Sequence, residues 1–78
     1  MERLGTVHRI AGNLLVLRAA SREHAPIGAT AIDEGLETVG RVVDVFGPVE
    51  NPYLAVTPND SDAAASLVGS PLYWRPNK

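Results

Sequence analysis

The chain has 78 residues, no cysteine and a formal net charge of −2. This length is sufficient for only one small domain. The missing cysteines exclude a disulfide framework and a thiolate metal site, and no apolar run approaches the roughly 18 residues of a membrane span. The seven Lys and Arg residues are scattered, without the basic stripe that a free-standing nucleic-acid binder usually carries. The N-terminal residues lack the apolar region of a signal peptide. We therefore expect a cytoplasmic protein that does not contact membranes.

Short β-rich runs separated by Gly, Pro, Asn and Asp dominate the sequence, which is typical of an all-β fold. Leu14, Leu15, Val16 and Leu17 leave no polar face on the second run, so we expect that strand to be buried on both sides. The predicted strands, in chain order, are Leu4–Ile10, Asn13–Ala19, Ala29–Ile32, Thr38–Phe46, Tyr53–Thr57 and Pro71–Trp74.

The segments between these strands carry turn and helix signals. Gly12-Asn13 is a tight turn, Ser21–Gly28 is a loop, and Asp33–Gly35 is a second turn. Several N-cap candidates in Asn59–Asp62 precede an alanine-rich run that Gly69 ends, so one or two helical turns are expected there.

About six strands and one short helical turn indicate a closed barrel, because closure removes exposed strand edges. We expect a single barrel domain over residues 1–75 and a short C-terminal tail over residues 76–78. Gly40 interrupts an imperfect alternation in the longest strand and indicates a bulge or a sharp coil of that strand. The residues expected in the core are Leu14, Val16, Val43, Val45, Leu54 and Val56.

Residues suited to catalysis or metal binding are few. His8 and His24 do not form a spaced ligand pattern, and the serines lack a neighbouring base. Asp60 and Asp62 are better interpreted as helix caps than as ligands. We therefore predict no catalytic residues, no metal site and no cofactor.

The stretch from Val39 to Tyr53 stands out. Two prolines and a glycine restrict the loop after Phe46, which lowers the entropy cost of binding a partner. Aromatic anchors in a fixed frame are the usual make-up of a protein–protein hot spot. The sequence leaves open whether this loop binds a partner or folds onto its own barrel.

The run Gly40–Val49 (GRVVDVFGPV) and the following Pro52–Val56 resemble the core signature of the Gar-type subunit of H/ACA ribonucleoproteins. Arg3–Val7 at the start and Val68–Tyr73 near the end also fit, so the resemblance spans nearly the whole chain. The compact chain is similar to the archaeal-type members. Because it lacks the Gly-Arg-rich tails of eukaryotic members, RNA contacts attributed to those tails are not carried over.

This resemblance implies a small six-stranded closed barrel of the translation-factor (reductase/elongation factor) type. It also implies a non-catalytic subunit that binds the TruB-like pseudouridine synthase, the dyskerin homologue. The subunit would assist pseudouridylation of ribosomal RNA through substrate loading and release, with the H/ACA guide RNA complex contacted mainly indirectly. An exposed docking face would also allow weak self-association of the isolated protein.

Position by position, the resemblance implies a docking surface on which Phe46 and Val49 are apolar anchors and Gly47-Pro48 shapes the loop. Asp44 and Arg41 either pair with the partner or are solvated. The predicted partner-binding residues are Gly40, Val42, Phe46, Gly47, Pro48, Val49, Pro52 and Tyr53.

Three other functions stay open. A Naf-type assembly factor uses the same barrel to hold the same synthase, but it normally has longer flanking segments. A small barrel that binds RNA directly in ribosome maturation or translation would need converging arginines and an exposed aromatic side chain. A small enzyme would need a deep pocket with a perturbed titratable group.

Overall fold

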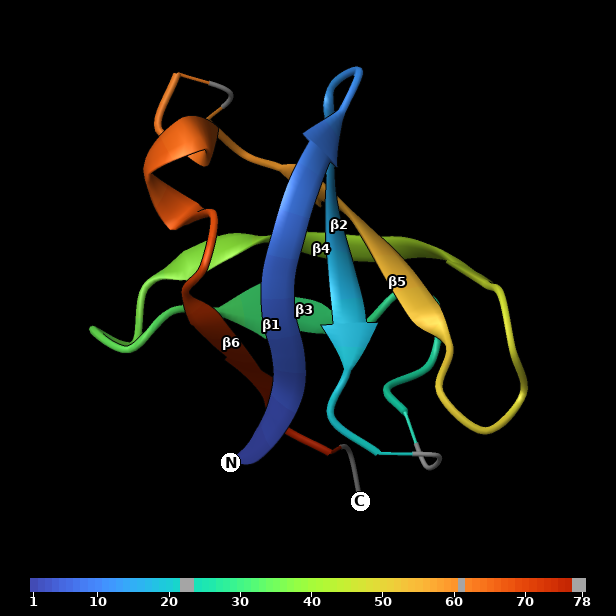
Figure 1. Ribbon diagram of the computed structural model, residues 1–78. Helices are drawn as coiled ribbons and strands as arrows, with labels where there is room; N and C mark the ends of the chain where they lie inside the picture. The colour runs from blue at the N-terminus through green and yellow to red at the C-terminus, as the bar shows by residue number, and fades with distance from the viewer. Residues whose placement is uncertain (22–23, 61, 77–78) are drawn as a thin grey trace.

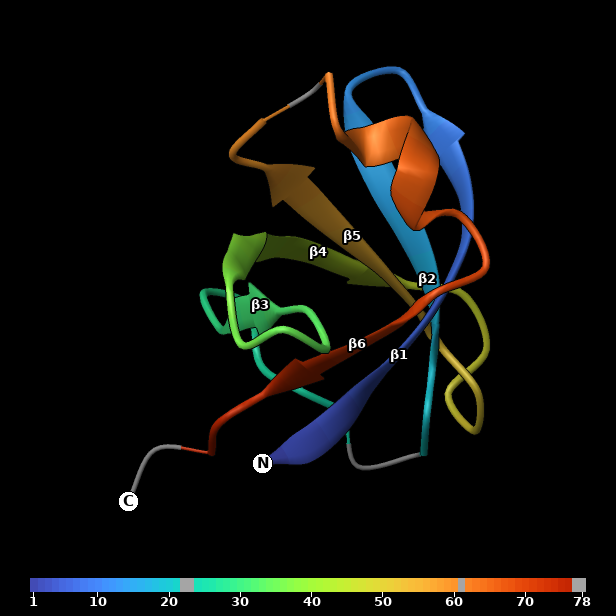
Figure 2. The same ribbon diagram turned by 90° about the vertical axis from the view of Figure 1, so that its left-hand side faces the viewer.

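Six antiparallel strands close into a barrel in the order β1-β2-β5-β4-β3-β6 (Figure 1). The computed structural model describes residues 1–21, 24–60 and 62–76. A short 3₁₀ helix, η1, follows β5 and precedes β6, at the same end of the barrel as the β1–β2 turn (Figure 2). The elements are β1 (Glu2–Ala11), β2 (Leu14–Ala19), β3 (Thr30–Ile32), β4 (Thr38–Phe46), β5 (Tyr53–Pro58), η1 (Ala64–Leu67) and β6 (Pro71–Trp74).

The six predicted strands and the closed barrel are confirmed. The bounds predicted for β4 and β6 agree with the structure, whereas β1 is longer than expected at both ends. Gly12 adopts φ 62° in the turn between β1 and β2, a conformation that a residue without a Cβ atom reaches at little cost. Arg22 and Glu23 of the predicted loop, the cap candidate Ser61 and the tail residues Asn77 and Lys78 lie outside the described residues.

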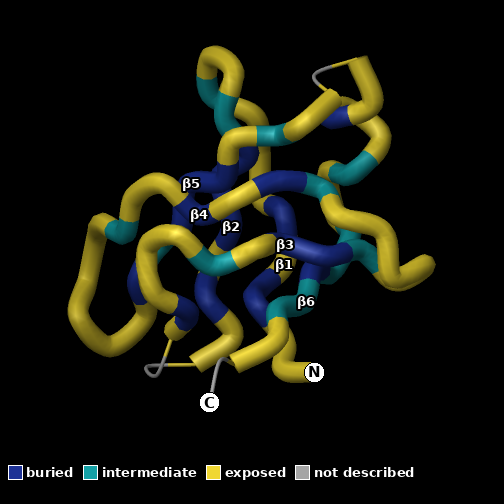
Figure 3. The backbone as a smooth tube through the Cα atoms, turned by 180° about the vertical axis from the view of Figure 1, so that it is seen from behind, coloured by how far each residue is buried: buried dark blue, intermediate teal, exposed yellow. Residues whose placement is uncertain are grey.

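The core fills the barrel interior, where buried segments from several strands meet (Figure 3). Alternation along each strand directs every second side chain inward. Leu54 and Val56 lie in this core as predicted, and Val45 is half-buried against it. The central cluster comprises Leu4, Val7, Leu15, Leu17, Ala19, Ala25, Ala31, Val42, Leu54, Val56, Ala64 and Leu72.

β4 departs from simple alternation, which corrects one core prediction. Its register against β5 shifts between Val42 and Asp44, so Val43 is the extra residue of a bulge. Val42 is 1% exposed in the core, whereas Val43 is 41% exposed. The prediction of Val43 as a core residue was therefore wrong, because the bulge turns both Val43 and Asp44 outward before Val45 returns inward.

Gly40 lies between two irregularities of β4 rather than at one. The register against β3 skips Val39, and the register against β5 skips Val43. A Cβ atom at Gly40 would overlap the carbonyl oxygen of Thr57 and lie 3.0 Å from Pro58 Cα. Glycine is needed here because the β5 backbone passes so close.

The short helix is present, but its predicted side-chain cap is not. Its N-cap position is Ala63, which makes no side-chain cap bond. Asp60 Oδ1 instead accepts from Asp62 N at 3.0 Å, and Asp60 O accepts from Ala63 N at 3.2 Å. Asp60 thus closes a turn before the helix. Within the described residues, no helix has both the length and the apolarity needed to span a membrane.

Candidate functional site

The outer surface of the β1-β2-β5-β4 sheet carries a row of side chains across all four strands. Strand register pairs Thr6 with Arg18, Arg18 with Tyr53, and Tyr53 with Phe46. Their neighbours Val7, Leu17 and Leu54 are buried in the core. Alternation therefore directs the row outward.

Tyr53 is the centre of this row. Its ring stacks on Phe46 with 5.7 Å between centroids and 23° between planes. The guanidinium carbon of Arg18 lies 5.2 Å from the Tyr53 centroid, within cation–π distance. Tyr53 is half-buried between these two neighbours, while Phe46 is 43% exposed. The stack therefore presents a fixed aromatic surface to solvent.

His8 extends this surface across β2. It is the extra residue of a bulge in β1, between Val7 and Arg9 in the register against β2. Its ring lies 6.3 Å from that of Tyr53, tilted by 46°. Adjacent strands are about 4.8 Å apart, so the contact between β1 and β5 reaches over β2. Val16 and Ala55, which face each other on this outer side, are buried but do not belong to the central cluster.

The loop between β4 and β5 continues the apolar surface. Val49 at its tip is 82% exposed, the most exposed large apolar side chain among the described residues. Gly47 has φ 91°, and a Cβ atom there would lie 3.0 Å from Tyr53 Cδ2. The loop can therefore leave Phe46 in this direction only with glycine at position 47.

Hydrogen bonds fix the loop to β2. The backbone N–H of Ala19 donates to Pro52 O at 3.0 Å. With its amide oxygen turned toward the guanidinium, Asn51 accepts from Arg18 Nε at 3.0 Å and from Nη2 at 3.3 Å. Arg18 thus holds both the loop and the Tyr53 ring. We call the surface formed by Phe46, Pro48, Val49 and Tyr53 the aromatic face, with His8 and Arg18 at its border.

The structure divides the predicted partner-binding residues into two groups. Phe46, Gly47, Pro48 and Val49 are exposed and Tyr53 is half-buried, so these five are brought together on one surface. Gly40, Val42 and Pro52 are buried. The assignment of Val42 to the docking surface was wrong, because β4 directs this side chain into the core. Gly40 and Pro52 have internal roles instead, the first in the close approach of β5 and the second as acceptor from Ala19.

His8 and Arg18 were not predicted at this site. They come from the first hairpin, and only the pairing of β2 with β5 brings Arg18 beside Tyr53. Neither β2 nor β5 alone carries a sequence signal for the pairing of the two strands. Asp44 is exposed, and its carboxylate accepts from the N–H of Val45 at 2.8 Å. Arg41 is also exposed, opposite Thr57.

A polar hollow of about 650 Å³ adjoins the aromatic face. Arg3 and Arg18 both line it, together with Thr6, Asn51 and the acidic Glu50. Two of the scattered arginines therefore converge next to an aromatic ring. Among the described residues, no group of three or more His, Cys, Asp and Glu side chains could hold a metal ion.

Comparison with known proteins agrees with the barrel. The family described as "Gar1/Naf1 RNA binding region" matches residues 1–77. An uncharacterized protein of Methanothermobacter thermautotrophicus is 26% identical over 76 residues, covering 94% of this chain and 82% of that protein. An uncharacterized protein of Methanocaldococcus jannaschii is 32% identical over 60 residues, covering 77% of this chain and 70% of that protein.

A solved structure is similar in fold. The structure described as the Gar1 domain of Naf1 superposes with a TM-score of 0.70 at 19% identity, covering 95% of this chain and 81% of that one. The family match covers the whole barrel, including the strands and the loop that form the aromatic face. The chain is therefore a member of the Gar1/Naf1 RNA-binding family.

Proposed function

We propose that the protein is a non-catalytic subunit of an H/ACA ribonucleoprotein in the cytoplasm, where it binds the TruB-like pseudouridine synthase. In this role it assists pseudouridylation of ribosomal RNA and the turnover of substrate. Membership of the Gar1/Naf1 family supports the association with H/ACA particles. The family is one of RNA-binding domains rather than enzymes, which supports a role without chemistry.

The aromatic face is the observation that supports docking onto a protein. Val49 and Phe46 expose large apolar side chains beside the ordered Tyr53 ring. Burying such a side chain contributes about 1.5–3 kcal/mol, and aromatic anchors near the centre of an interface commonly carry most of the binding energy. Because Gly47, Asn51 and Arg18 already fix the loop, binding would cost little additional conformational entropy.

Direct binding of RNA is the second candidate, and a separate observation favours it. Arg3 and Arg18 line one hollow, and Arg18 packs on Tyr53. Phosphate contacts from arginine and stacking of bases on aromatic rings are the two contributions that bind single-stranded RNA. Glu50 lies in the same hollow and weakens its attraction for phosphate. We therefore rank docking on the synthase first.

A pair of calorimetric titrations distinguishes the two candidates. The protein is titrated with the TruB-like synthase of the same source, and separately with H/ACA guide RNA alone. Saturable binding to the synthase without binding to free RNA supports docking. Salt-sensitive binding to RNA, with no binding to the synthase, would replace docking with the direct RNA function.

The contribution to turnover needs a separate assay. In a reconstituted guided reaction, the protein is expected to raise the rate under multiple turnover more than the rate of a single turnover, because release of the modified RNA limits the former. Equal effects on both rates would contradict a role in turnover. They would leave docking itself to be decided by the titration.

A further inference from the structure

The barrel is closed by its weakest pairing, between β3 and β6. Register joins these strands at a single residue pair, Ile32 with Tyr73. In an antiparallel pair, the next positions along the same ladder are Ala31 with Trp74 and Thr30 with Arg75. Neither of these pairs forms, so β6 separates from β3 directly after the pair of Ile32 with Tyr73.

The peptide groups of Thr30 face the space that β6 leaves. Val42 accepts from Gly28 N at 2.8 Å and donates to Ala29 O at 2.9 Å, so its peptide groups face the β3 side. Peptide groups along a strand alternate in direction, so those of Gly40, two residues away, also face β3, where its register partner is Ala31. The N–H and C=O of Thr30 therefore point away from β4, toward the missing part of β6.

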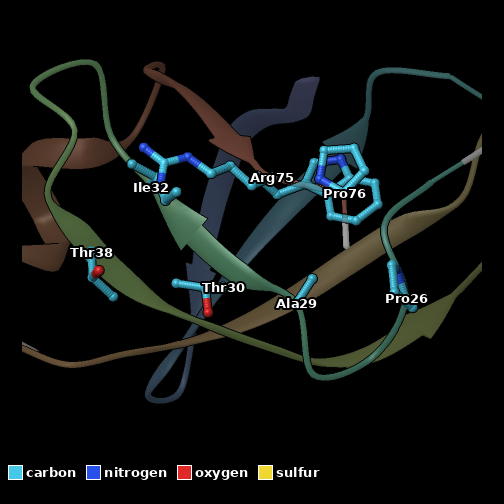
Figure 4. Close-up of a pocket in the computed structure, with 8 residues that line it drawn as sticks. Pro26, Ala29, Thr30, Ile32, Thr38, Arg75 and Pro76 are labelled. Atoms are coloured by element: carbon cyan, nitrogen blue, oxygen red, sulfur yellow. The ribbon is translucent and has the colours of Figure 1, made fainter. Parts of the chain in front are cut away.

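An open hollow of about 640 Å³ occupies this position. Figure 4 shows Thr30 on β3 beneath it, with the Arg75 side chain extended from the end of β6 toward Ile32. Ile32 is buried and Trp74 is half-buried, so both present only part of their apolar surface here. The hollow is lined by Pro26, Ala29, Thr30, Ile32, Thr38, Trp74, Arg75 and Pro76.

The polar side chains of this hollow have no partners within the described residues. Neither the hydroxyl of Thr30 nor that of Thr38 makes a hydrogen bond there, and Arg75 makes no ion pair. The Arg75 guanidinium therefore places a permanent positive charge at the mouth of the hollow. The hollow also contains one strand edge and the apolar side chains of Ile32 and Trp74. These features match the needs of an extended peptide.

We call the place where β6 separates from β3 the seam. We propose that the seam binds an extended segment of a partner polypeptide, which adds as a strand antiparallel to β3 where β6 no longer pairs with it. Main-chain hydrogen bonds to Thr30 would supply affinity, as in other cases of strand addition to a sheet edge. The segment carries an apolar side chain against Ile32 and Trp74 and a carboxylate toward Arg75. A strand edge specifies a peptide rather than RNA, because RNA has no main-chain amide groups that could pair with the N–H and C=O of Thr30.

This site is separate from the aromatic face. None of the residues that line the hollow belongs to that face or to its border. The proposal therefore stands or fails independently of docking on the synthase.

A designed peptide tests the seam directly. Isotope-labelled protein is titrated with acetyl-Thr-Val-Thr-Glu-Thr-Val-Thr-amide while amide chemical shifts are followed. One control peptide has Lys in place of Glu, and another is N-methylated at alternate residues so that it cannot pair with a strand. We expect saturable shifts at Thr30, Ala31 and Trp74, a Kd about three- to fivefold weaker for the Lys peptide, and no saturation with the methylated peptide.

Reversal of the charge on the protein provides the matched variant. Arg75 is exposed, so Arg75→Glu is expected to keep the fold. In this variant, the Lys peptide should bind more tightly than the Glu peptide. Absence of saturable shifts at Thr30, equal binding of the methylated peptide, or an unchanged preference for Glu in Arg75→Glu would each overturn the proposal.

Discussion

Gly40 shows how one residue permits two strands to approach. Its Cα lies so near β5 that a methyl group would overlap the Thr57 carbonyl oxygen, which belongs to the backbone and cannot rotate away. The family-like run that contains Gly40 was interpreted as a docking motif, yet this residue serves the barrel. A motif that is read from sequence thus mixes residues that shape the fold with residues that contact a partner.

We expect Gly40→Ala to lower the free energy of unfolding by about 2 kcal/mol or more, because β5 must move to admit the methyl group. Gly35→Ala is the matched control, since a Cβ atom there would make only an ordinary contact, at 3.4 Å from Asp33 Oδ1. Urea denaturation measures both. A loss at Gly40 no larger than that at Gly35 would contradict the close approach.

At the scale of elements, β4 determines which side chains face the core and which face solvent. Because of the bulge at Val43, the apolar residues on either side of it, Val42 and Val45, both point inward. Strict alternation would have directed them to opposite faces. This single bulge explains why the core assignment of Val43 was wrong, whereas the docking assignment of Val42 came from the family resemblance.

The two valines provide a test of the bulge. Val42→Ala removes methyl groups from the core and should cost about 2–3 kcal/mol of unfolding free energy. Val43→Ala changes a residue that is 41% exposed and should stay within about 0.5 kcal/mol. Both losses are measured by urea denaturation. A loss for Val43→Ala that equals or exceeds the loss for Val42→Ala would contradict the buried Val42 and the outward Val43.

The same reasoning indicates how far the sequence could predict this protein. Six strands and their approximate bounds follow from β-rich runs and turn residues, which act locally. The family signature supplied the loop with Phe46 and Val49. The bulges at His8 and Val43 depend on strands distant in sequence, as does the contact of Arg18 with Tyr53. Such features have no local signal, so the structure was needed to find them.

The seam between β3 and β6 should be the first part of the barrel to open. One residue pair joins these strands, whereas β1 and β2 pair at six. Amide hydrogen exchange of Thr30 and Ile32 is therefore expected to be faster than that of Leu15 and Leu17 in β2. Comparable protection at the two locations would indicate that the seam is paired more extensively.

On the scale of the whole molecule, the aromatic face and a group of acidic side chains lie on different parts of the barrel. The aromatic face lies on the β1-β2-β5-β4 side, with Arg3 and Arg18 at its edge. Asp33, Glu37 and Asp60 line a hollow by the β3–β4 turn. The barrel has a net charge of −2, and its aromatic face is therefore suited to a protein partner more than to a polyanion.

Salt dependence follows from this distribution. An apolar docking surface should keep its affinity for the synthase within about threefold between 50 and 200 mM salt, because exposed charges contribute little. Two phosphate contacts, one each from Arg3 and Arg18, would weaken binding to single-stranded RNA about sevenfold over the same range. A steep salt dependence of synthase binding would indicate that charges, and not the aromatic face, dominate the interface.

The central claim is that the aromatic face holds the synthase. Its most direct test is the Kd for the synthase of Phe46→Ala and Val49→Ala, compared with Val68→Ala, a control that is also exposed (47%) but remote in sequence from the β4–β5 loop. The account predicts that each of the first two weakens binding at least tenfold, while Val68→Ala stays within about twofold and all three keep the wild-type melting temperature within a few degrees. Wild-type affinity in both Phe46→Ala and Val49→Ala would contradict it.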